Sequence, residues 1–284
     1  MARLLALLVS RPPPVSRSAF MAHRNPAPRN GATRREAPPA PAFAWGPERI
    51  LFEDECLIVV DKPSGLPTQP TLDARRASAH STLAAFLRER DGGTPYLGLQ
   101  HRLDRDTSGV LLFTRDPRAN AGVTALFSGK AVRKTYLALA VAGAGAPDAW
   151  EIANHLGIVG REGKASRFGA VRSGGDPART SFRVVERLCG AILVEASPQT
   201  GRTHQIRVHL AEGGHPILGD VLYGGPTRFP GGGKGAPFSV PRVMLHAAGL
   251  EFVHPMTQAA LKITCPCPED FETCLRTLRS ASPA

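Results

Sequence analysis

The sequence predicts an α+β fold, in which a mixed, largely antiparallel sheet carries helices at its periphery. Short apolar runs outnumber helical stretches, and several of them follow one another across short turns. Elements of this kind, grouped rather than strictly alternating, are typical of the α+β class. Apolar residues make up 42% of the 284 residues and aromatic residues 6%, which is ordinary for a globular domain with one large core.

The first half of the chain is expected to combine short strands with two helices. Ser81 has a side chain that caps helices, and the apolar residues of the next turns share one face. Pro117 is expected to open a second helix and Gly129 to end it. The expected strands are 50–52, 57–60, 110–114 and 134–142, and the expected helices are 82–90 and 118–128.

The second half is expected to contain two further helices and four strands. Apolar and polar residues alternate around Phe182, and a second run returns after a short turn, as in a hairpin. Ile206 and Leu210 lie on one helical stripe. The Gly- and Pro-rich stretch 224–241 is expected to be a mobile loop. The expected strands are 180–188, 191–197, 243–253 and 260–265, and the expected helices are 203–212 and 269–279.

Residues 1–45 are predicted to be a disordered basic tail, and residues 46–284 to form one domain. The tail holds seven arginines, eight prolines and a single acidic residue, a composition that cannot bury enough apolar surface to fold. It contributes six of the eleven net positive charges, so the domain itself is only mildly basic. The charge favours an anionic partner such as a nucleic acid.

The first twenty residues leave the location of the protein open. Their apolar run is short and is followed by Arg11 and three prolines, a poor context for signal-peptide cleavage. A cytoplasmic location is expected, with an organelle as the alternative if residues 1–20 act as a transit peptide; Met21 is an alternative start. No run approaches the ~18–20 apolar residues that a membrane span needs, so no membrane partner is expected.

Five cysteines are present, an odd number that fits a reducing compartment. None of them has Cys-x-x-Cys spacing. Cys265 and Cys267 with Cys274 could in principle bind zinc, but a lone Cys-x-Cys in a strand is more typical of two small packing residues. No metal is therefore expected there.

A charged turn at 101–109 stands immediately before the expected strand 110–114. It places Asp104 between two arginines and ends in small residues and a glycine. Nearby positive charge keeps a carboxylate ionised, which suits a nucleophile or an electrostatic stabiliser better than an acid. Taken alone, such a turn can equally be a solvated connection with local ion pairs.

The string His-Arg-Leu-Asp-Arg-Asp-Thr-Ser-Gly at 101–109 resembles the signature of the RluA-type RNA pseudouridine synthases. Further blocks resemble the same family, occur in the family's order and, together with the signature, cover roughly residues 50 to 268. The resemblance implies a pseudouridine synthase-like catalytic domain that converts specific uridines to pseudouridine in structured RNA. These further blocks are 57–66, 133–138, 201–210, 214–220 and 245–255.

The resemblance also implies roles for individual residues. Asp104 would be the catalytic carboxylate, Arg207 would pair with it through a bidentate contact, and Tyr136 would stack on the everted base and relay a proton. Without the resemblance, Arg207 is a surface cation of a helix, and Tyr136 and Leu250 are strand core. The residues expected to bind the RNA are Arg102, Arg105, Lys62, Lys134, Arg202, His204 and Leu250.

The expected reaction is an isomerisation, so it consumes no redox cofactor, ATP or metal, and no cofactor is expected. Whether Asp104 bonds to the sugar or assists an elimination stays open. The expected partner is a stem-loop of ribosomal or transfer RNA, because residues 1–45 are too short and Pro-rich for the S4-type RNA-binding module of many relatives. A monomer without an obligatory protein partner is expected.

Three other functions remain as alternatives at this point. A metal-dependent hydrolase could use Asp104 and Asp106 with His101 or His204 as ligands. A glycosidase would use two carboxylates and release a free base or sugar. A non-enzymatic RNA-binding protein would need the basic tail but no carboxylate at position 104.

Overall fold

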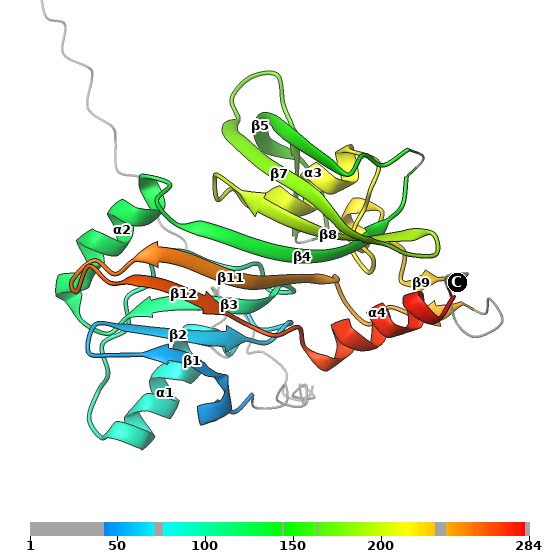
Figure 1. Ribbon diagram of the computed structural model, residues 1–284. Helices are drawn as coiled ribbons and strands as arrows, with labels where there is room; N and C mark the ends of the chain where they lie inside the picture. The colour runs from blue at the N-terminus through cyan, green and yellow to red at the C-terminus, as the bar shows by residue number, and fades with distance from the viewer. Residues whose placement is uncertain (1–42, 71–75, 144, 164, 231–236, 282–284) are drawn as a thin grey trace, which may run out of the picture. The chain divides into compact units, whose positions relative to one another are not determined.

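The computed structural model describes residues 43–70, 76–143, 145–163, 165–230 and 237–281. The predicted tail lies outside the described residues as far as residue 42. Ten of the described strands form one sheet (Figure 1). They are β1 (Ile50–Glu53), β2 (Leu57–Lys62), β3 (Ser108–Thr114), β4 (Arg133–Val141), β5 (Ala149–Glu162), β6 (Ala165–Ala170), β7 (Asp176–Arg187), β8 (Ala191–Pro198), β11 (Leu245–Val253) and β12 (Ala260–Thr264).

The sheet order is β1-β2-β3-β11-β4-β8-β7-β5-β6, with β12 paired to β11 at the side. Every pair is antiparallel except β3 with β11, which run parallel. The prediction of an α+β fold with a mixed, largely antiparallel sheet is therefore confirmed. Two small strands, β9 (Arg228–Phe229) and β10 (Phe238–Ser239), form a separate hairpin inside the stretch expected to be a loop.

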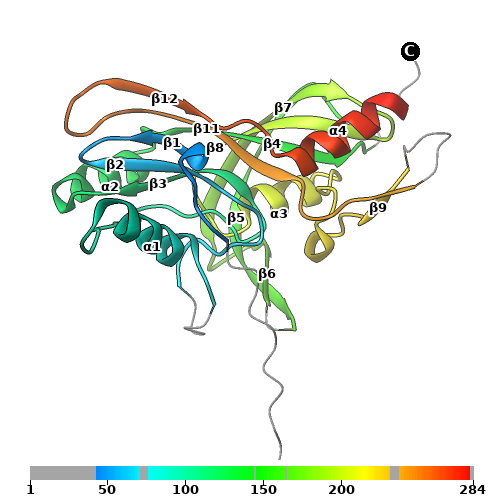
Figure 2. The same cartoon turned by 90° about the horizontal axis from the view of Figure 1, so that it is seen from below.

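Four α-helices lie around the sheet within the described residues (Figure 2). The first begins earlier than expected, because Ser78 rather than Ser81 is the N-cap. Ser81 is instead the third helical residue and completes a reciprocal capping box with Ser78. The α-helices are α1 (Ala79–Asp91), α2 (Asn120–Ser128), α3 (Gln205–Glu212) and α4 (Glu269–Ala281), and the short 3₁₀ turns are η1 (Pro47–Arg49), η2 (Pro117–Ala119) and η3 (Val221–Tyr223).

Strand β2 divides the core into two layers, because its successive side chains point to opposite faces. Ile58 and Val60 pack with Leu83 and Leu87 of α1. The intervening residues of β2 pack on the other face in the same cluster as Val123 of α2. The two helices thus cover opposite faces of this end of the sheet and fix β3, which directly follows the turn that carries Asp104.

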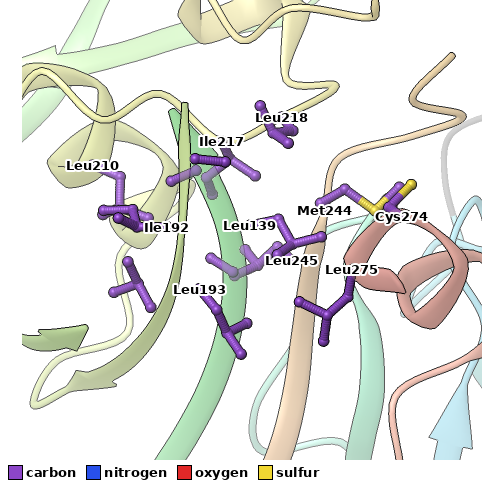
Figure 3. Close-up of a cluster of buried hydrophobic side chains, with 14 of the residues drawn as sticks. Leu139, Ile192, Leu193, Leu210, Ile217, Leu218, Met244, Leu245, Cys274 and Leu275 are labelled. Atoms are coloured by element: carbon purple, nitrogen blue, oxygen red, sulfur yellow. The ribbon is translucent and has the colours of Figure 1, made fainter. Parts of the chain in front are cut away.

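A larger cluster fills the other end of the sheet. Figure 3 shows Leu139 and Ile192 of the paired strands β4 and β8 among these side chains, and Cys274 and Leu275 of α4 belong to the same cluster as Met244. Helix α4 has one apolar face, so burying Leu275 and its neighbours leaves its charged residues in solvent. The packed elements bring the start of α3 to the sheet centre, near the start of β4.

The packed body starts slightly earlier than expected. Trp45, the last residue of the predicted tail, is 6% exposed and packs in the α1 cluster. Its indole nitrogen donates to the Thr82 hydroxyl at 2.9 Å, and its ring meets Phe43 edge-on. Residues 43–45 therefore belong to the domain, because the packing of two aromatic rings offsets the entropy lost when a short segment becomes ordered.

Gly109 is expected to be far less tolerant of substitution than Gly65, although both have positive φ (110° and 82°). A Cβ at position 109 would collide with the Ala247 carbonyl oxygen across the β3–β11 pair, whereas a Cβ at position 65 meets nothing within 4 Å. Gly109→Ala should lower the free energy of unfolding by about 3 kcal/mol or more, and Gly65→Ala by about 1 kcal/mol. Urea unfolding of both variants measures this; equal losses would contradict the steric explanation.

Candidate active site

Lys62, which was expected to line the RNA path, instead anchors the turn that carries Asp104 by hydrogen bonds to backbone carbonyls. The Lys62 side chain is fully buried, and its ammonium donates to the carbonyls of Pro63, Leu66 and Arg105 at 2.8, 2.9 and 3.1 Å. Burial lowers the pKa of Lys62 to about 7, and the charge of Asp104 opposes this shift. The prediction for Lys62 was wrong: it ties two loops together and does not line the cavity.

Thr68 holds the residue immediately before Asp104. Its hydroxyl donates to the Leu103 carbonyl at 2.7 Å and accepts from the Leu103 amide at 3.1 Å. Both residues are buried, so one hydroxyl satisfies two backbone groups that water does not reach. Ser64 adds a hydrogen bond to the Asp106 carbonyl at 2.7 Å on the other side. Asp104 therefore stands on a turn fixed on both flanks.

Asp104 faces a cavity of about 650 Å³ between the start of β4, the turn 101–107 and the start of α3. Asp104 is the single carboxylate among the described residues that line it. Phosphate groups are attracted to such a site because lysines and arginines outnumber the carboxylate in the lining. The basic residues that line the cavity, apart from histidines, are Arg102, Lys130, Lys134, Arg202 and Arg207.

A second cavity of about 560 Å³ adjoins the first on the side of residues 67–70. The two share Arg102, Asp104 and His204 in their walls. The cleft therefore continues past Asp104 in two directions.

The expected bidentate contact between Arg207 and Asp104 is not present; Arg207 makes it with Asp220 instead. Nε and Nη2 of Arg207 donate to the two Asp220 oxygens at 2.7 Å each, and Nη1 lies 3.7 Å from Asp104 Oδ2. Asp220 is 1% exposed, so its buried charge needs the planar guanidinium fork. Asp104 is left with one longer ion pair and a side free to face substrate.

Asp220 and Tyr223 complete the site and were not assigned roles from the sequence. The guanidinium carbon of Arg207 lies 5.0 Å from the centre of the Tyr223 ring, a cation–π geometry. Both residues come from the segment after α3, which passes beneath Arg207. An aspartate separated by only Gly219 from the apolar pair Ile217-Leu218 is the one sequence signal that could have pointed to this support.

Tyr136 lines the cavity from β4. Its hydroxyl has no hydrogen-bond partner among the described residues. Burial raises the pKa of Tyr136 well above its usual value, and the charge of Asp104 adds to the shift. The phenol therefore stays protonated near neutral pH and offers a ring face and a donor proton to a ligand.

Four of the expected RNA-binding residues line the cavity together. Arg102 donates to the Thr203 hydroxyl at 2.8 Å, and Lys134 donates to the Thr200 carbonyl at 2.8 Å. Burial lowers the pKa of Lys134 to about 8. Arg105 lines only the second cavity and pairs with Asp106 at 2.9 Å. The four in the first cavity are Arg102, Lys134, Arg202 and His204.

Leu250 does not form part of the cavity wall. It is 3% exposed and packs with Val110 and Val123 on the α2 side of the sheet. Leu245, five residues earlier on β11, lines the cavity instead. The pairing of β11 with β4 shifts between Ala247 and Gly249, an irregularity that the sequence does not reveal.

The structure also bears on the alternatives left open above. In the part of the chain that the structure describes, no three His, Cys, Asp or Glu side chains are grouped as metal ligands, and this includes Cys265, Cys267 and Cys274. Among the same residues, no helix combines the length and apolar character that crossing a membrane requires.

Comparison with known protein families finds one family model that matches. It is the model of RNA pseudouridylate synthases, and it matches residues 56–212, more than half of the chain. The chain belongs to this family. The matched segment contains Asp104, Tyr136 and Arg207 and ends at the last residue of α3. The chain is therefore an RNA pseudouridine synthase, an isomerase that acts on RNA.

Curated relatives agree with this assignment. The synthase is 35% identical over 249 residues to the ribosomal large subunit pseudouridine synthase D of Xanthomonas campestris, covering 83% of this chain and 71% of the relative. It is 38% identical over 232 residues to the ribosomal large subunit pseudouridine synthase C of Vibrio cholerae, covering 82% of this chain and 70% of the relative.

Solved structures agree with the fold. Human RNA pseudouridylate synthase domain containing 4 matches with a TM-score of 0.64 and 28% identity, over 82% of this chain and 93% of the human chain. Human RNA pseudouridylate synthase domain containing 1 matches with a TM-score of 0.59 and 26% identity, over 85% and 100% of the two chains. The synthase therefore shares the sheet arrangement of these enzymes.

Proposed function

We propose that this synthase converts a uridine in a stem-loop of ribosomal or transfer RNA to pseudouridine, with Asp104 as the catalytic carboxylate and without a cofactor. One observation carries the proposal. Asp104 is the single carboxylate that the described residues contribute to a cavity whose other charged residues are lysines and arginines, and it lies 3.7 Å from Arg207. The reaction needs an anionic group at one carbon of the sugar, and this position of Asp104 supports its assignment as that group.

The chemistry of the isomerisation sets the roles of the residues. The N1–C1′ bond of uridine breaks, the C5–C1′ bond forms, the hydrogen at C5 is lost to solvent and N1 gains a proton. Asp104 acts at C1′, either by bonding to it or by stabilising its positive character. Tyr136 stacks on the detached base and retains its own proton.

The target nucleotide must leave its stack to reach Asp104. Eversion costs a few kcal/mol, which contacts between cations and phosphates offset. Arg102 and Lys134 supply such contacts on the cavity wall. Ribosomal RNA is favoured as the substrate because the relatives named above are ribosomal large subunit synthases.

The proposal is tested with RNA labelled with tritium at uridine C5 and isolated from cells that lack the synthase. The purified enzyme should release tritium equally with and without EDTA. Digested product should show pseudouridine replacing uridine one for one. Free uracil would indicate a glycosidase, and loss of activity in EDTA would indicate a metal. Pseudouridine maps of RNA from cells with and without the protein would identify the substrate.

Thr68→Val is expected to lower kcat about tenfold, whereas Thr68→Ser retains most of the activity. Valine has the shape of threonine but leaves the buried amide and carbonyl of Leu103 without partners, at about 1–3 kcal/mol. The turn that carries Asp104 then loses one of the three side chains that hold it, and Lys62 and Ser64 remain. Tritium release at varied RNA concentration measures kcat and KM, and equal kcat in the two variants would contradict the positioning role.

A further inference from the structure

His204 has an unusual backbone conformation at the start of α3. Its φ is 57°, in the left-handed region, and its side chain makes no capping hydrogen bond. A residue with a Cβ pays about 1–2 kcal/mol for this conformation, which glycine would adopt freely. Strain of this kind concentrates at functional sites. The conformation holds the imidazole in the wall shared by the two cavities beside Asp104.

Tyr223 fixes which ring nitrogen of His204 carries the proton. The Tyr223 hydroxyl accepts a hydrogen bond from the Phe168 amide at 3.1 Å and lies 2.8 Å from His204 Nδ1. Since the hydroxyl proton has no other acceptor among the described residues, donation from Tyr223 to Nδ1 is the arrangement that gives this proton an acceptor. His204 therefore carries its own proton on Nε2. Edge contacts with the rings of Phe168 and Tyr223 keep the imidazole plane fixed.

The Nε2–H group of His204 is free to donate a hydrogen bond to a ligand. The described side-chain atoms that are buried without a hydrogen bond are Gln100 Oε1 and His254 Nε2. His204 Nε2 also has no hydrogen bond to a described residue and is not among these atoms, so it is accessible to solvent. Burial lowers the pKa of His204, so the ring is neutral at pH 7. The nearby charged groups oppose one another: Asp104 and Asp220 raise this pKa, while Arg207 and Arg102 lower it.

We propose that His204 binds the everted nucleotide by donating its Nε2–H to an acceptor oxygen, and that Tyr223 positions this donor. The acceptor is a carbonyl oxygen of the uracil or an oxygen of the nucleotide's phosphate. The inference rests on the proposed function of Asp104 and adds a second contact beside it. Tyr223 then supports two groups at once, since its ring lies against Arg207 and its hydroxyl orients His204.

Two substitutions at position 204 test the contact. His204→Ala should lower kcat/KM for tritium release from C5-labelled RNA about tenfold or more, the scale of one lost hydrogen bond in a desolvated site. His204→Gln should recover part of this loss, because its amide offers a neutral N–H at similar reach. A phosphate acceptor predicts a raised KM, and a uracil oxygen that gains charge as the bond breaks predicts a lowered kcat.

Tyr223→Phe tests the positioning role by removing only the hydroxyl. In ¹⁵N-histidine-labelled protein, NMR should show His204 as the Nε2–H tautomer, with the signal assigned by its absence in His204→Gln. In Tyr223→Phe the tautomers should mix and the pKa of His204 should rise, since the neutral ring loses the donor that stabilises it. Thermal denaturation checks that each variant is folded.

Three results would overturn the proposal: an Nδ1–H tautomer in the wild type, an unchanged His204 signal in Tyr223→Phe, or a wild-type kcat/KM in His204→Ala. Asp104→Asn, assayed in parallel, separates this inference from the proposed function. If Asp104→Asn were inactive and His204→Ala fully active, the role of His204 would be refuted and that of Asp104 would stand. An active Asp104→Asn would instead refute the role of Asp104.

Discussion

Asp104→Asn is expected to reduce tritium release from C5-labelled RNA by at least about a thousandfold, the scale seen when an enzyme loses its reacting group. Asparagine has the shape of aspartate but no negative charge to place at C1′. It also leaves Arg207, 3.7 Å away, without its second carboxylate. The loss should fall on kcat, because the cations of the cavity still bind the RNA backbone.

Asp106→Asn is a matched control for this variant. Asp106 lies two residues away, pairs with Arg105 and lines neither cavity. Its substitution should change kcat/KM by no more than about threefold, as expected for an exposed ion pair worth under 1 kcal/mol. RNA affinity, measured by filter binding, should be similar in wild type and both variants. Comparable losses of activity in the two variants would show that net charge, not position 104, matters.

Arg207→Lys is expected to have the second largest effect, a fall of about a hundredfold in kcat/KM. One ammonium cannot donate two parallel hydrogen bonds to Asp220 and also remain near Asp104. The buried Asp220 carboxylate is then poorly paired, which should lower the free energy of unfolding by about 3 kcal/mol. Both tritium release and thermal denaturation are needed, because the two effects have different causes.

Arg242→Lys separates the two effects. Arg242 makes the same bidentate contact with Asp270, at 2.6 and 2.8 Å, but lines neither cavity. Its substitution should lower stability while each folded molecule keeps its activity. If Arg207→Lys lost activity only in proportion to its unfolded fraction, Arg207 would be a structural residue and not part of the site.

Much of the fold could be predicted because most strands are short apolar runs between clear turns. The hairpin of β5 and β6 was missed because its residues give no such signal. Ile158 and Val159 are exposed there (61% and 47%), and glycines and arginines surround them. Long-range pairing with β7 stabilises β5, and this information is not local to the sequence.

The main parts of the site could also be predicted, since Asp104, Tyr136 and Arg207 meet at one cavity. What failed were inferences about which way a side chain faces. Lys62 has a charged group typical of the surface but is buried against three carbonyls. The partner choice of Arg207 could not be foreseen, because Asp220 reaches it only through a turn beyond α3.

The most direct test of the catalytic role of Asp104 is a comparison of pseudouridine maps from three strains. One lacks the synthase, one carries the wild type and one carries Asp104→Asn at the same protein level. The account predicts sites present with the wild type that are absent in both other strains. Restoration of those sites by Asp104→Asn would contradict it.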